Sequence, residues 1–175
     1  MNTQKQLQYY EAAIIAAPRR VLAGDTGWNK DITRDAGVYV IWKGKSPVYV
    51  GETSALRARM RDITNVKNHS FAKRTCALFG LCASDKEGLV STYSSNYELS
   101  FCAIPFGRKE VEEYLILRWR STLSNKETAR LLAGHQYSWV VPAPTFETDT
   151  GITADIQGGA GSQAKELDVE LVEAL

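Results

Sequence analysis

The sequence predicts an α/β protein of the α+β kind, with a small, mostly antiparallel sheet of three or more strands flanked by helices. Two short runs of β-branched and aromatic residues, 38–42 and 47–50, are separated by a turn, which is typical of a β-hairpin. A third such run spans residues 97–105. Segments with helical spacing of apolar residues lie before and after these runs, so helices are expected to cover the sheet.

The first expected helix covers residues 4–17, where Pro18 ends it. After the hairpin, Thr53 or Ser54 is expected to cap a second helix that runs to about Ile63.

The later elements are less regular. Residues 64–95 are polar and broken, with a helix expected only near 71–81. A strong helical pattern follows the third strand over 109–123. A short helix over 126–133 and a last strand over 137–141 complete the expected elements.

We expect one globular domain with a tail. Residues 1–36 form an N-terminal helix and lead-in, and residues 37–145 form the main domain, which carries an insertion at 64–96. Residues 146–162 are rich in glycine and small polar residues, so a flexible linker is expected there. An acidic amphipathic helix is expected over 163–175.

The net charge is +1, but the charges are unevenly distributed. Between residues 37 and 130, 15 lysines and arginines stand against 9 aspartates and glutamates, a net charge of +6. Residues 146–175 carry 1 lysine against 7 acidic residues, a net charge of −6. A basic body suits a polyanion such as DNA, with ordinary solvated surface charge as the alternative. The tail is interpreted as a solubility segment, the alternatives being an oligomerisation helix or an anionic mimic on the basic face.

Composition argues against several classes of protein. The chain has no run of about 18 apolar residues, so no membrane span is expected. Its start lacks a basic region before the apolar stretch, so no signal peptide is expected. Cys76, Cys82 and Cys102 are irregularly spaced, which indicates reduced thiols in a cytoplasmic protein. A zinc site from these cysteines and His69 matches no strong ligand spacing.

Two charged residues fall on helix faces that are expected to turn inward. At about 100° per residue, Arg59 borders the apolar face of its helix, and Glu112 lies within the apolar arc of a later one. Arg57 and Arg61 point toward solvent. Because unpaired buried charge is costly, Arg59 and Glu112 need either a partner or a function. A salt bridge between them is the structural alternative.

The hairpin resembles the signature of the GIY-YIG nuclease family, and the resemblance covers roughly residues 36–126. The matching elements, in chain order, are Gly37-Val38-Tyr39, Tyr49-Val50-Gly51, Arg59, Glu112 within an E-x-x-L-I helix, and Asn125. The two tyrosines are ten residues apart, as in the family pattern. Several elements in one order are more specific than a single tripeptide.

This resemblance implies an endodeoxyribonuclease that depends on Mg²⁺ or Mn²⁺. Glu112 would hold the cation, and Arg59 would present its planar fork to the phosphate. Tyr39 would be the general base, with its pKa lowered from about 10 by Arg59 or the cation. Tyr49 would contact the nucleophile or the phosphate and is the alternative base. Asn125 would complete the catalytic set.

Residue type alone leaves structural alternatives, namely strand packing for the tyrosines and a helix C-cap for Asn125. The chain also departs from the family pattern. Glu52 stands where many members carry a lysine, and Ile63 where many carry a tyrosine or histidine. His69 is the candidate catalytic substitute, because 69-HSFAKR-74 resembles a segment of some small members, although a lone histidine is more often structural.

Basic side chains concentrate between residues 55 and 74. The predicted DNA-binding residues are Arg57, Arg61, Lys67, Lys73 and Arg74. Such residues contact phosphates without reading sequence, and a solvated helix face is the alternative. No zinc finger, helix-turn-helix or homeodomain pattern is present, so the insertion at 64–96 is expected to recognise the target.

We therefore expect a DNA endonuclease, either of restriction type or from a mobile element. DNA is the expected partner, and cutting both strands would imply a homodimer or sequential nicking. A catalytically inactive nucleic-acid-binding module is the alternative, and it would not need Arg59 and Glu112 in one cleft. A third hypothesis is an interaction protein that uses its C-terminal helix.

Overall fold

The computed structural model describes residues 3–125, 139 and 141–147. Its helices are α1 (Thr3–Ala16), α2 (Leu56–Arg61), α3 (Ser70–Phe79), α4 (Lys86–Asn96) and α5 (Arg108–Arg118). Its strands are β1 (Arg20–Val21), β2 (Gly37–Lys43), β3 (Ser46–Thr53) and β4 (Glu98–Ala103). None of the helices among these residues combines the length and the hydrophobicity that a membrane span requires.

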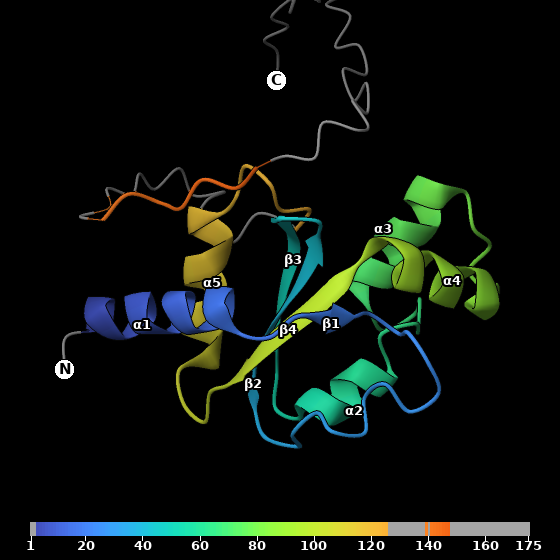
Figure 1. The fold of residues 1–175 in the computed structure, drawn as a ribbon, viewed down its shortest axis with the longest axis horizontal. Coiled ribbons are helices and arrows are strands. Elements are labelled where there is room, and N and C mark those ends of the chain that lie inside the picture. The colour runs from blue at the N-terminus through green and yellow to red at the C-terminus, as the bar shows by residue number, and fades with distance from the viewer. Residues whose placement is uncertain (1–2, 126–138, 140, 148–175) are drawn as a thin grey trace, which may run out of the picture.

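The predicted α+β architecture is confirmed. The strands form one antiparallel sheet in the order β1-β4-β2-β3. Helices α1 and α5 lie on one side of this sheet, and α2, α3 and α4 lie on the other (Figure 1). Each face buries its own apolar cluster, because alternate residues of β2 point to opposite sides.

The hairpin of β2 and β3 is confirmed, and its register explains the spacing of the tyrosines. The turn uses Gly44 at a φ of 56°, a backbone conformation that glycine adopts without strain. Tyr39 pairs with Gly51, and Ile41 pairs with Tyr49. The two tyrosines are therefore diagonal neighbours on one face, with ring centroids 6.3 Å apart.

Close approach explains both glycines of the motif. A Cβ atom on Gly51 would overlap the ring and hydroxyl of Tyr39, which lie directly across it. A Cβ atom on Gly37 would overlap the carbonyl oxygen of Cys102 and the side chain of Leu56. The motif glycines thus leave room for the Tyr39 ring and for the neighbouring strand and helix.

We expect Gly51→Ala to destabilise the protein by about 1–3 kcal/mol, as overpacked cores do, and to displace the Tyr39 hydroxyl. Urea denaturation measures the stability. Gly24→Ala is the matched control, because a Cβ atom there meets Val21 at an ordinary 3.4 Å. Equal urea midpoints for Gly51→Ala and Gly24→Ala would contradict the close approach of Gly51 and the Tyr39 ring.

The start of α2 differs from the prediction. Its N-cap is Ala55, which makes no side-chain cap bond, so neither Thr53 nor Ser54 caps this helix. Instead the Thr53 hydroxyl accepts a hydrogen bond from the Ala55 backbone N–H at 3.1 Å and closes the turn before it.

Helix α4 was missed, because the segment was expected to be irregular. The Asp85 carboxylate caps it by accepting a hydrogen bond from the Gly88 backbone N–H at 2.8 Å. Leu89 and Tyr93, four residues apart, are its buried residues. Glycine and several serines dilute this apolar spacing in the sequence, while packing on the sheet stabilises the helix.

The other elements follow the prediction with small changes. Helices α1 and α3 and strand β4 are confirmed, whereas the two-residue strand β1 was not expected. Helix α5 ends at Arg118 rather than at residue 123. The predictions for residues 126–133, 148–162 and 163–175 lie outside the described residues, as does most of 137–141.

A buried charge network joins α1, α5 and the segment near residue 141. The Arg118 Nε donates to Glu11 Oε1 at 2.9 Å, and the Trp119 indole donates to the same oxygen at 2.8 Å. The remaining Arg118 nitrogens donate to the backbone carbonyls of Val141 and Pro142, each at 2.8 Å. The side chains of Arg118 and Glu11 are only 2% and 8% exposed. Each therefore needs the opposite charge of the other to offset the cost of its burial.

Candidate active site

The Tyr39 hydroxyl lies at the centre of the candidate site. Tyr39 is fully buried, and its oxygen lies 2.9 Å from Nε2 of His69, which is also fully buried. Arg59 Nε donates to the same hydroxyl at 3.4 Å. Two candidate catalytic side chains thus meet the hydroxyl of a third. Tyr39 comes from the hairpin, Arg59 from α2, and His69 from the position just before α3.

Burial decides the protonation states of this group. It raises the pKa of both Tyr39 and Tyr49, and Arg59 opposes that shift without cancelling it. Arg59 therefore does not lower the Tyr39 pKa toward 7, contrary to the sequence-based expectation for that residue. Burial, followed by the nearby Arg59 charge, lowers the pKa of His69 to about 4, so its imidazole is neutral at pH 7.

Only one of the two ring nitrogens of His69 has a hydrogen-bond partner among the described residues. Its Nδ1 atom is buried and has no hydrogen-bond partner among the described residues. The tautomer decides whether Tyr39 donates to Nε2 or accepts from it. The histidine is therefore not held by a conventional structural pair of hydrogen bonds.

Glu112 occupies the second turn of α5 and is half-buried. Burial and the neighbouring Glu52 charge together raise its pKa to about 7, against the opposing effects of the Glu52 backbone N–H and of Arg59. Glu52 itself accepts a hydrogen bond from Arg108 Nε at 2.6 Å. The carboxylate of Glu112 is thus only weakly stabilised by its protein surroundings.

Arg59 and Glu112 do not form the salt bridge considered as an alternative. None of the ion pairs among the described residues joins them. Burial is the largest cause of the raised pKa of Tyr39 and Tyr49. In addition, the Arg59 charge lowers the pKa of both tyrosines, and the Glu112 charge raises it. The two charges therefore lie near the same pair of phenols.

Asn125 lies against the outer edge of β3. Its Oδ1 accepts from the Val50 backbone N–H at 2.9 Å, and its Nδ2 donates to the Val50 carbonyl at 2.8 Å. The amide group therefore pairs with the strand as another strand would. Trp119, rather than Asn125, is the C-cap of α5.

The predicted DNA-binding residues lie in different environments. Lys67, Lys73 and Arg61 are exposed. Arg57 is half-buried, and its Nε donates to the Ile32 carbonyl at 2.6 Å. Arg74 is half-buried and its charge acts on the Tyr49 phenol, while its Nη1 is buried without a partner among the described residues.

Sequence reasoning missed the roles of Arg108 and Ser70. Arg108 lies one turn before Glu112 and holds Glu52 beside it. The Ser70 side chain hydrogen-bonds Tyr49, which partly offsets the effect of burial on its pKa. The pairing of Arg108 with Glu52, 56 positions away, and the approach of Ser70 to Tyr49 both depend on tertiary packing, so no local pattern signals either contact.

Comparison with known proteins gives one set of weak matches. A scan against protein-family models and a search of curated proteins both find no match. Solved structures of the GIY-YIG N-terminal endonuclease domain of UvrC from Thermotoga maritima do match. The magnesium-bound form has 16% identity and a TM-score of 0.35, over 69% of this chain and 94% of that one.

A tyrosine-to-phenylalanine point mutant of that domain, bound to its catalytic divalent cation, matches with 16% identity and a TM-score of 0.35. That alignment covers 69% of this chain and 93% of the other. These domains belong to the family that the paired tyrosines resemble. A likeness of this size carries no weight for the chemistry, which is inferred below from the side chains of this chain.

Proposed function

We propose that this protein is a divalent-cation-dependent endonuclease of the GIY-YIG type, which hydrolyses phosphodiester bonds of DNA. The observation that supports it is the convergence of Arg59 and His69 on the Tyr39 hydroxyl, with the Glu112 carboxylate close enough to act on the same phenol. These residues come from four separate parts of the chain. A phosphate-binding cation, a proton acceptor and a carboxylate are the groups that phosphodiester hydrolysis requires.

The carboxylate fits a magnesium or manganese ion. Glu112 is half-buried and its pKa is raised to about 7, so its charged form lacks a sufficient counter-charge in the protein alone. The described residues hold no cluster of three metal-ligating side chains. Mg²⁺ is usually held by one or two carboxylates and keeps several waters, so Glu112 would serve as its protein ligand. When bound, the ion supplies charge stabilisation at the phosphate and the leaving oxygen.

The proton path runs through Tyr39 and His69. We assign Tyr39 as the acceptor of the proton of the attacking water, while its own hydroxyl proton moves to Nε2 of His69. The water oxygen then bonds to phosphorus, and the leaving oxygen departs with the electron pair of the broken bond and takes up a proton from solvent. Burial disfavours a charged His69, so the relay depends on the negative phosphate beside Arg59 to offset the new positive charge.

Other side chains position this group. Arg59 orients the phosphate, and Arg74, with a buried unpaired Nη1, is a second candidate to meet its oxygens. Asn125 fixes the edge of β3 through Val50, between Tyr49 and Gly51 of the motif. We assign Asn125 as a positioning residue, since both polar atoms of its side chain are already engaged.

The proposal is tested with supercoiled plasmid DNA in Mg²⁺, in Mn²⁺ and in excess EDTA. Conversion to nicked or linear DNA only with added cation is expected. Linear product formed without a nicked intermediate would indicate paired active sites, as in a homodimer. Cleavage that persists in EDTA would contradict the proposal.

A catalytically inactive nucleic-acid-binding module remains a second candidate, because burial raises the pKa of the proposed base Tyr39. Such a module would bind plasmid, single-stranded and branched DNA and leave all of them intact with either cation. That result would contradict the proposal that the protein is an endonuclease.

The affinity for Mn²⁺ is expected to depend on pH through Glu112. Its folded pKa of about 7 lies above the ordinary carboxyl value of 4.5, so below pH 7 the cation must displace a proton. Affinity should fall by up to about tenfold per pH unit below 7. By the same shift, the metal-free protein loses stability as the pH rises from 4.5 to about 7, because burial penalises the charged form.

Calorimetric titration of Mn²⁺ over a range of about pH 6 to 8 measures this dependence. Glu110→Gln, an exposed change on the same helix, should keep the wild-type profile. Glu112→Gln should remove most of the binding. A flat wild-type profile would contradict the assignment of Glu112 as the ligand.

A further inference from the structure

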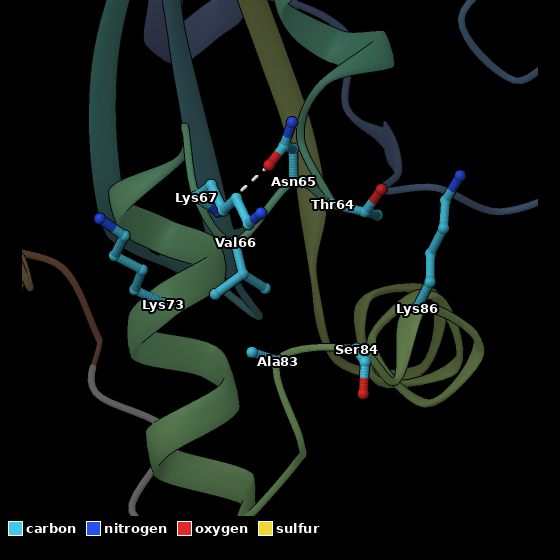
Figure 2. Close-up of a pocket in the computed structure, with 8 residues that line it drawn as sticks. All are labelled: Thr64, Asn65, Val66, Lys67, Lys73, Ala83, Ser84 and Lys86. Carbon is cyan, nitrogen blue, oxygen red and sulfur yellow. Dashed lines mark hydrogen bonds between the residues drawn. The ribbon is translucent and has the colours of Figure 1, made fainter.

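A pocket of about 690 Å³ lies in the insertion, outside the candidate active site. Figure 2 shows that its walls come from the loop after α2, from α3 and from the turn that enters α4. Lys73 on α3 and Lys86 on α4 lie on opposite sides, with Lys67 on the loop between them. We call this site the lysine pocket.

The three ammonium groups of the lysine pocket carry no ion pair among the described residues. All three side chains are exposed. No acidic residue lines the pocket. The pocket therefore presents uncompensated positive charge on a concave surface.

Two of the acids that flank the pocket in the sequence, Asp62 and Asp85, are engaged by other groups. The Asp62 carboxylate accepts hydrogen bonds from the side chains of Asn65 and Asn68. The Asp85 carboxylate caps α4 through the Gly88 backbone N–H. These contacts shape the walls of the pocket and leave its lysines free for a ligand.

The lysine pocket and the candidate active site are linked through α3 and the loop before it. The His69 backbone N–H donates to the Asn65 carbonyl at 2.9 Å, which ties the loop of the pocket to this candidate catalytic histidine. Lys73 and Arg74 are neighbours on α3, and while Lys73 lines the pocket, the Arg74 charge acts on Tyr49. The pocket and the candidate active site are therefore connected through one loop and one helix.

We propose that the lysine pocket holds the sugar–phosphate backbone of DNA on one side of the scissile phosphate, an inference that rests on the proposed function. Three ammonium groups without a fixed fork suit phosphates as point charges. No aromatic ring lines the pocket, so it lacks the stacking platform that an unpaired base requires. Contacts of this kind strengthen binding without reading the sequence.

The test measures binding of a fluorescent DNA duplex by anisotropy in EDTA, where cleavage does not interfere, at several salt concentrations. The variant combines Lys67→Ala, Lys73→Ala and Lys86→Ala. Its control combines Lys5→Ala, Lys30→Ala and Lys43→Ala, which removes the same charge elsewhere on the surface. Circular dichroism melting confirms that both remain folded.

The slope of log affinity against log salt should become shallower by about 2–3 for the pocket variant, close to 0.9 for each lost phosphate contact. The control should keep nearly the wild-type slope. The loss of affinity should be equal for unrelated DNA sequences. Equal slopes for the two variants, or no DNA binding by the wild type, would overturn the inference.

The outcome is separable from that of the proposed function. Binding in EDTA does not depend on Glu112 or on any chemical step. Cation-dependent cleavage together with equal slopes would reject the lysine pocket and keep the nuclease. A pocket-specific slope change without cleavage would support the DNA contact and reject the nuclease.

Discussion

Replacing Glu112 with glutamine is expected to reduce the single-turnover rate of DNA cleavage by about a thousandfold or more, even in excess Mg²⁺. Glutamine keeps the size and most of the shape of the side chain but cannot carry the negative charge that holds the cation. The loss reflects several kcal/mol of transition-state stabilisation that the cation supplies. Folding should be retained, because burial already disfavours the charged form of Glu112.

Two features make this experiment discriminating. Glu110→Gln removes the same charge from an exposed position of α5 and should cleave at close to the wild-type rate. The Glu112→Gln variant should still bind DNA in EDTA, since phosphate contacts do not need the carboxylate. Wild-type cleavage by Glu112→Gln would remove this residue from the active site.

Replacing Glu11 with alanine is expected to lower the free energy of unfolding by about 3–5 kcal/mol, the usual cost of breaking a buried ion pair from one side. Arg118 would keep its bonds to the carbonyls of Val141 and Pro142 but lose its counter-charge. The Trp119 indole would lose its acceptor as well. The effect should be large, because α1 and α5 meet through this carboxylate.

Urea denaturation measures this loss as a lower midpoint with an unchanged slope. Gln6→Ala, at an exposed position of the same helix, should change stability by no more than about 0.5 kcal/mol. Replacing both charges together, as Glu11→Leu with Arg118→Met, should recover much of the stability. A loss below about 1 kcal/mol for Glu11→Ala would show that the network is not a structural requirement.

The elements that depend on local pattern could be predicted from the sequence. The hairpin, the helix over 71–81 and the third strand follow from apolar spacing and turn residues. The inward positions of Arg59 and Glu112 follow from helix periodicity, and both are partly buried. Helix α4 could not be predicted in the same way, because only Leu89 and Tyr93 anchor it and its other residues favour a loop.

The contacts that define the site depend on packing between distant segments. His69 meets Tyr39 across 30 positions of the chain, and no local pattern identifies that partner. The pKa of Tyr39 follows from complete burial, which residue type does not reveal. Likewise Glu11 and Arg118 lie 107 positions apart, so their pairing appears only when α1 packs on α5.

We propose that Arg59 and Glu112 act in one catalytic centre, although no ion pair joins them. Single-turnover cleavage by Arg59→Ala, by Glu112→Gln and by the double variant tests it most directly. If the two residues work as a unit, the double variant should be little slower than the slower single variant. Wild-type activity in either single variant, or fully multiplicative losses in the double variant, would contradict one shared centre.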